Sequence, residues 1–137
     1  MTKSIAMAVF IIYTASFIPS LIIIIFLTIK LRKKKYSIIN DISKNAPSRF
    51  KKRALLLIES NPSWVFACSV GQTWYSYIML RYGWKISKIE IKKWHNNIEL
   101  VFQPYHVIYK ANVFLINTWI AALPILIILV YTHKYYP

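Results

Sequence analysis

Two long apolar runs, one near each end of the chain, dominate the pattern of hydrophobic and polar positions. The first run, residues 4–29, contains no formally charged side chain, and the second, residues 111–133, contains none when its histidine is neutral. About 20 apolar residues are enough to cross the hydrocarbon core of a bilayer. Both runs are therefore predicted to be transmembrane helices, although a buried or interfacial helix remains an alternative for the second.

The first run is followed at once by a basic segment, residues 30–35, in which five of the six side chains are Lys or Arg. A cleaved signal peptide has a shorter apolar stretch of about 7–15 residues and a small-residue cleavage site. The apolar run of residues 4–29 is longer than that of a signal peptide, and basic residues follow it directly. Both features favour a transmembrane helix that is not cleaved off.

Residues 30–62 are predicted to form a basic juxtamembrane stretch and one amphipathic helix. Asn45-Ala-Pro47 is typical of a helix start, and Asn61-Pro62 of a helix end. Between them the apolar positions follow helical spacing, and the charged positions lie on the other side: Phe50, Ala54, Leu57 and Ile58 against Lys51, Lys52 and Arg53. Such a helix lies on lipid headgroups or packs on its own domain, and the sequence leaves both open.

Residues 63–110 change to short runs of β-branched and aromatic residues, separated by turn residues such as Gly71, Gly83 and Asn96-Asn97. This pattern predicts an antiparallel β-meander. The alternative is a third membrane helix over Trp64–Leu80, a stretch without formal charge. The expected fold is thus a membrane α+β protein, in which two transmembrane helices flank a small cytoplasmic insert made of one helix and a meander.

The order of anchor, basic stretch, helix ending in Asn-Pro, and meander resembles the YcxB-like domains, small membrane-anchored bacterial domains related in style to bacterial PH-like domains. The similarity is carried by Trp84 and Ile89 in one segment and by Ile108, Lys110 and Phe114 in another. Tyr109 stands where that pattern has Pro, and here the second apolar run follows the domain. The resemblance implies a meander and no general enzymatic activity.

The distribution of charge predicts the topology. The 137 residues carry a net charge of +14, and 16 of the 18 Lys and Arg lie between Lys30 and Lys110. Basic loops stay on the cytoplasmic side. Residues 30–110 are therefore expected in the cytoplasm and both termini on the opposite side of a bacterial inner membrane, or its organellar equivalent.

The same basic residues are the candidate binding residues, and two aromatic residues are the candidates for the membrane interfaces. Basic clusters attract anionic lipid headgroups or a protein partner. Nucleic acid is not expected, because Trp74, Tyr75 and Tyr77, which offer stacking surfaces, are needed as the core of a meander. The candidates are Lys33, Lys34, Lys35, Arg49, Lys51, Lys52, Arg53, Lys85, Lys88, Lys92 and Lys93, with Trp119 and Tyr131 at the interfaces.

The sequence offers little for catalysis. Its four acidic residues are scattered, its three histidines have no second ligand at metal-binding spacing, and Cys68 is a lone thiol. No catalytic residue, metal or cofactor is therefore predicted. The expected function is that of a non-enzymatic accessory or regulatory protein that binds a protein partner or itself, such as an immunity or conjugative exclusion protein. The alternatives are a structural subunit of a larger membrane complex and a sensor of anionic lipids.

Overall fold

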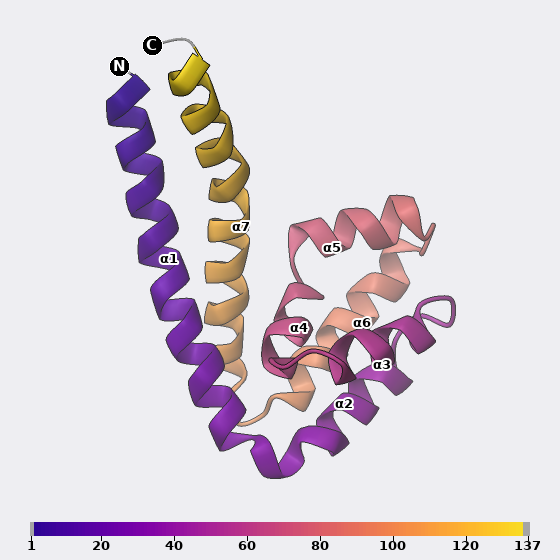
Figure 1. Cartoon of the computed structure of the whole chain (residues 1–137). Helices are drawn as coiled ribbons and strands as arrows, with labels where there is room; N and C mark the ends of the chain where they lie inside the picture. Colours follow the sequence, from indigo (N-terminus) through magenta and orange to yellow (C-terminus); the bar gives the residue numbers. More distant parts are fainter. Residues whose placement is uncertain (1, 136–137) are drawn as a thin grey trace.

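Every regular element in the described part of the chain, residues 2–135, is helical in the computed structural model (Figure 1). Two long helices enclose a series of short ones. The elements in chain order are α1 (Thr2–Lys30), the 3₁₀ turn η1 (Arg32–Lys34), α2 (Lys35–Lys44), α3 (Lys51–Glu59), α4 (Trp64–Val70), α5 (Trp74–Ile78), the π-helical η2 (Met79–Gly83), α6 (Lys88–Val101) and α7 (His106–Tyr135).

Helices α1 and α7 form an antiparallel hairpin, with their free ends at the same end of the molecule (Figure 1). Both are long and apolar enough to span a membrane, over Lys3–Lys30 and His106–His133, each with a mean hydropathy of 2.5 in its most apolar window. Few of the residues in these windows are buried inside the protein. The predicted spans, 4–29 and 111–133, lie within these two helices.

The β-meander predicted for residues 63–110 is wrong, because the structure has helices α4, α5 and α6 there and no strand anywhere in residues 2–135. The fold is therefore all-helical rather than α+β. The expected turn at Asn96-Asn97 lies inside α6. A single helix over Trp64–Leu80 is not formed either, since α4 ends at Val70 and α5 starts at Trp74.

Side-chain caps explain why these short segments are helical. Ser63 Oγ accepts a hydrogen bond from the amide of Phe66, and Thr73 Oγ1 accepts one from Ser76, so each helix start satisfies a free amide. Helix α6 begins with a full capping box, in which Ser87 and Glu90 each cap the other's backbone amide. These polar contacts outweigh the modest strand preference of the aromatic residues that follow them.

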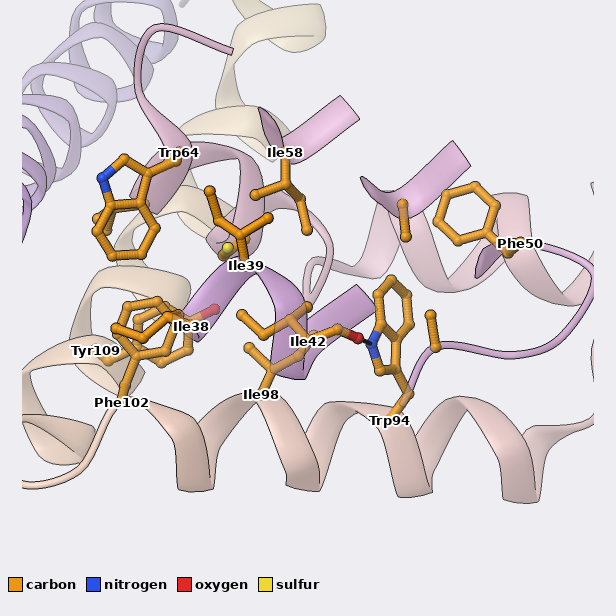
Figure 2. Close-up of a cluster of buried hydrophobic side chains, with 14 of the residues drawn as sticks. Ile38, Ile39, Ile42, Phe50, Ile58, Trp64, Trp94, Ile98, Phe102 and Tyr109 are labelled. Carbon is orange, nitrogen blue, oxygen red and sulfur yellow. Dashed lines mark hydrogen bonds between the residues drawn. The ribbon is translucent and has the colours of Figure 1, made fainter. Parts of the chain in front are cut away.

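The insert between the long helices shares its hydrophobic core with the hairpin (Figure 2). Helices α2 and α6 face each other through Ile42 and Ile98, and Trp94 Nε1 donates to the carbonyl of Ile42 at 3.0 Å. The hairpin contributes Leu27 from α1 and Tyr109 from α7, and Leu31, which directly follows α1, belongs to the same core. Burial of these side chains holds the insert against the base of the hairpin.

Candidate functional site

Two of the predicted basic clusters come together at the end of the insert that lies farthest from the hairpin (Figure 1). Phe50 packs edge-on against both Trp84 and Trp94, at ring-centroid distances of 5.4 and 5.8 Å, and this joins the start of α3 to the segment leading into α6. We call the resulting surface the distal basic patch; it consists of Arg49, Lys51, Lys52, Arg53, Lys85, Lys88, Lys92 and Lys93.

All eight side chains of the distal basic patch are exposed. Arg53 lies 5.1 Å above the ring of Trp84, a cation–π contact that bridges the two clusters. The acidic residue nearest in sequence, Glu90, is engaged in the capping box of α6. The patch therefore carries a strong positive potential that the chain's own carboxylates do not balance.

Exposed leucines continue the distal basic patch along α3. Leu55, Leu56 and Leu57 follow Arg53 directly and are all exposed, Leu56 by 65%. The predicted inward position of Leu57 is therefore only partly right: it lines a cavity but remains exposed, whereas Phe50, Ala54 and Ile58 are buried. A basic surface bordered by apolar side chains is typical of protein-binding sites, in which apolar anchors supply affinity and charges supply orientation.

The third predicted cluster, Lys33, Lys34 and Lys35, lies apart from the distal basic patch. It occupies η1 and the start of α2, where the chain leaves α1 at the base of the hairpin (Figure 1). Lys33 and Lys34 are exposed, and Lys35 is half-buried with its ammonium 5.5 Å from the ring of Tyr36. Basic residues in this position, at the end of a helix apolar enough to span a membrane, are suited to contact with lipid headgroups.

The two predicted interface aromatics lie in different surroundings. Trp119 packs between helices: its ring is edge-on to Phe17 at 5.5 Å and to Tyr13 at 6.3 Å, and it stacks on Phe66 of α4 at 6.3 Å. It therefore joins α1, α7 and α4. Tyr131 is exposed near the end of α7, a position compatible with the far membrane interface.

A buried polar network connects the hairpin to the insert. Ser20 Oγ donates to Asn112 Oδ1 at 2.9 Å, and Asn112 Nδ2 donates to Ser69 Oγ at 3.0 Å. These three side chains come from α1, α7 and α4, and all are buried.

Asn117 joins α7 to α5. Its Oδ1 accepts a hydrogen bond from the backbone amide of Trp74 at 3.0 Å, so it anchors the first turn of α5 rather than α1. This hydrogen bond fixes the position of the start of α5 along the length of α7. No local sequence pattern indicates this hydrogen bond, because the donor is a backbone group whose position depends on the tertiary fold.

A partly open apolar cavity of about 210 Å³ lies in the insert, lined by residues of α2, α3, α4, α5 and α6. Cys68 lines it and is buried, and burial raises the pKa of its thiol above the ordinary value. A thiol that stays protonated is a poor nucleophile. The cavity thus offers space and apolar surface, but its cysteine is suited to packing rather than to covalent chemistry.

His95 is the histidine with the most defined surroundings. Its Nε2 lies 3.0 Å from the carbonyl of Gly71, and its own carbonyl accepts a hydrogen bond from Gln72 Nε2 at 2.6 Å. Burial lowers the pKa of His95, while the Gly71 contact and the charge of Glu99 act in the opposite direction. His95 therefore joins α6 to the end of α4 as a neutral side chain near pH 7.

The described residues, 2–135, contain no group of three His, Cys, Asp or Glu that is arranged to hold a metal ion. Comparisons with models of protein families, with curated proteins and with solved structures gave no match to this chain. Its function is therefore argued from its own surfaces, of which the distal basic patch has the most distinct chemistry.

Proposed function

We propose that this chain is a non-enzymatic accessory or regulatory protein of a bacterial inner membrane, which binds the acidic surface of a protein partner through its distal basic patch. The observation that carries the proposal is the assembly of eight exposed cations beside the exposed leucines of α3. Immunity and conjugative exclusion proteins are the functional classes that we would examine first.

Electrostatics and apolar area both support a protein partner. Clustered like charges repel one another in the free protein, and an acidic surface relieves this repulsion and accelerates association. Leu55 and Leu56 add apolar area that a partner protein buries. The aromatic side chains that nucleic acid would stack on, Trp74 and Tyr75, belong to α5 and not to the patch, so nucleic acid is not the partner that we propose.

The proposal includes the predicted orientation, with residues 30–110 in the cytoplasm and both termini on the opposite side. The free ends of α1 and α7 lie together (Figure 1), which supports placing both termini on the same side of a membrane; the choice of side rests on the basic residues between the two helices. A reporter enzyme fused to the C-terminus, and in a second fusion to the N-terminus, is expected to be active on the periplasmic side. Cytoplasmic signals from both fusions would refute the proposed orientation, and signals on opposite sides of the membrane would refute the two-span topology.

Site-specific photo-crosslinking in native membranes tests the proposed partner. A photoreactive amino acid replaces Lys52 in one variant and Lys92 in another, and Tyr36 serves as the matched control, since it is exposed but lies outside the patch. We expect the same protein adduct from both patch positions and not from Tyr36. Raising the salt concentration to about 1 M shortens the screening length to about 3 Å and should weaken the adduct.

Adducts at positions 52 and 92 that contain only lipid or only a second copy of this chain would contradict the proposed partner. If a larger complex co-purifies in mild detergent through the transmembrane helices and leaves the patch uncovered, the alternative of a structural subunit applies.

The cluster Lys33–Lys35 favours a second role, attraction to anionic lipid, because it lies where α1 ends. The test compares the full chain in nanodiscs of neutral lipid and in nanodiscs with anionic lipid. A fluorophore at Lys34 should report a change between the two discs, and one at Lys92 should report a smaller change. Equal signals in both discs at Lys34 would remove this role.

A further inference from the structure

The apolar cavity of the insert, about 210 Å³ in volume, is larger than the gaps that close-packed protein interiors leave. Its walls come from α2, α3, α4, α5 and α6, and among the lining side chains Ile42, Ile58 and Ile98 point into the core (Figure 2). Side chains that line an empty apolar space lose dispersion contacts. An apolar ligand that fills this space is therefore bound favourably.

Polar groups in the cavity wall have partners within the fold. Ser76 Oγ donates to the carbonyl of Val70 at 2.7 Å, and Asn61 Oδ1 accepts from the amide of Ser63 at 3.0 Å. The thiol of Cys68 stays protonated, because burial raises its pKa above the ordinary value. The wall is therefore suited to hydrocarbon rather than to a polar ligand.

The cavity is open on the side between α3 and α5. Two lining side chains there are exposed, Leu57 by 55% and Tyr75 by 56%. Arg53 precedes Leu57 by one helical turn, so it borders the same edge of α3. The carbonyl of Met79, a lining residue, accepts from the amide of Trp84 at 3.0 Å, and Arg53 lies 5.1 Å above the Trp84 ring. Arg53 is therefore placed at the edge of the opening.

The side chain of Arg53 is able to bind a carboxylate in this position. It is exposed, and no carboxylate within residues 2–135 forms an ion pair with it. A guanidinium that stacks on an aromatic ring keeps the N–H groups in its plane accessible, and these match the two oxygens of a carboxylate. The opening thus combines a hydrocarbon-lined cavity with a cation at its edge.

The volume of the cavity limits the length of hydrocarbon that it holds. An apolar cavity of roughly 150 Å³ holds benzene. In proportion, a cavity of 210 Å³ holds about eight carbon atoms. One short acyl chain fits this space, whereas the two long chains of a membrane phospholipid do not.

We propose that the cavity of the insert binds a single-chain fatty acid, with its hydrocarbon end inside and its carboxylate bound by Arg53. The occupant is a fatty acid rather than a second copy or a partner protein, because the apolar cavity and the cation at its edge together match an apolar chain with one anionic end. The site consists of residues of the insert alone. It depends neither on the orientation in the membrane nor on the partner of the distal basic patch.

Photo-crosslinking of the full chain in nonionic detergent tests the site. The probe is octanoate that carries a diazirine near its hydrocarbon end, and the labelled peptides are identified by mass spectrometry. We expect an adduct on the lining residues of α3, α4 or η2 that saturates with the concentration of the probe and that unlabelled octanoate prevents. Octylammonium has the same chain and the opposite charge, so it should need a several-fold higher concentration to compete.

Two variants with matched controls separate the cavity from the cation. Ala67→Leu fills part of the cavity and should abolish the saturable adduct, whereas Ala111→Leu adds the same atoms at an exposed position of α7 and should not. Arg53→Gln should weaken the binding of octanoate several-fold. Arg32→Gln makes the same change at an exposed residue of η1 and should leave the binding unchanged.

An adduct that grows with the probe concentration without saturating would overturn the proposal, since the probe would then only be dissolved in the detergent micelle. Equal competition by octanoate and octylammonium would overturn it too, because the site would not recognise a carboxylate. This comparison uses the unmodified protein and so holds where a variant fails to fold. Equal labelling of the unmodified protein and of Ala67→Leu with an unchanged circular dichroism spectrum would place the ligand outside the cavity.

Discussion

Asn112 connects three helices through one side chain. It accepts from Ser20 on α1 and donates to Ser69 on α4, and all three side chains are buried. Removal of the amide leaves the hydroxyl of Ser20 without its acceptor in a buried position, whereas the hydroxyl of Ser69 keeps its hydrogen bond to the carbonyl of Val65. The stability of the hairpin and its attachment to the insert therefore depend on the same residue.

The variant Asn112→Ala is expected to lower the free energy of unfolding by roughly 1–3 kcal/mol, because it removes two buried hydrogen bonds. Thr118→Ala is the matched control, since Thr118 Oγ1 bonds only within α7, to the carbonyl of Phe114. Unfolding of the detergent-solubilised chain by sodium dodecyl sulfate, followed by circular dichroism, measures both variants. An effect of Thr118→Ala as large as that of Asn112→Ala would contradict the role of the network.

Because the pKa of His95 is lowered in the folded protein, the free energy of unfolding is expected to depend on pH. Burial lowers its pKa in the folded protein below the ordinary value of 6.5, with Glu99 as the nearby charged group. In the unfolded chain the imidazole binds a proton as the pH falls through about 6.5, while the folded protein resists protonation. The free energy of unfolding should therefore be highest above pH 6.5 and decrease as the pH falls below it.

The variant His95→Gln removes the titrating group and should flatten this decrease. Thermal unfolding in detergent between pH 5 and pH 8, monitored by circular dichroism, compares the variant with the wild-type chain. An equally steep loss of stability in His95→Gln below pH 6.5 would assign the effect to another group.

At the scale of elements, helices α4, α5 and α6 each begin at a polar residue whose side chain caps the first turn. In the meander predicted for residues 63–110, Ile98, Leu100 and Phe102 would share one face of a strand, yet Leu100 is exposed while Ile98 and Phe102 are buried. The burial in fact follows a helical repeat: Ile91, Trp94, Ile98 and Phe102 all face the core. The sequence Ser-x-x-Glu at Ser87 was the signal that could have identified this helix.

The variant Ser87→Ala should destabilise the chain by about 1 kcal/mol, because it removes the side-chain cap of α6. Ser37→Ala is the matched control, since Ser37 is exposed within α2 and caps no helix start. Chemical unfolding of the full chain in detergent measures the difference. If both variants are equally stable, the capping box does not hold the start of α6.

Patterns of single elements were predicted from sequence more completely than contacts between elements. The two apolar spans and the amphipathic α3 follow from runs and spacings within one segment. The union of two basic clusters in the distal basic patch required the packing of Phe50 on Trp84 and Trp94, which no local pattern encodes. The anchoring of α5 by Asn117 is equally a product of the tertiary fold.

At the scale of the whole molecule, the insert and the hairpin form one cooperative unit. Leu27 and Tyr109 belong to the long helices, and both are fully buried in the core of the insert. Tyr109 stacks on Phe102 with a centroid distance of 3.9 Å. Loss of a large buried side chain costs about 2–5 kcal/mol, out of a total stability of about 5–15 kcal/mol for a typical domain.

The isolated segment 31–105 is therefore expected to lack a fixed tertiary structure. Its near-ultraviolet circular dichroism should be weak, and its thermal unfolding should be broad, whereas the full chain in detergent should unfold sharply. Far-ultraviolet signal from residual helices is expected in both. A sharp, cooperative transition of the isolated segment would show that the insert folds without the hairpin.

The shared core also sets an order of events during synthesis. The ribosome completes α1 first, but Tyr109 and Asn112, which close the core and the buried polar network, lie in the last helix. Until α7 emerges and packs beside α1, the core of the insert is open. The nascent chain must therefore be shielded from proteases and from aggregation through most of its translation, and its final fold is reached only when the last helix is in place.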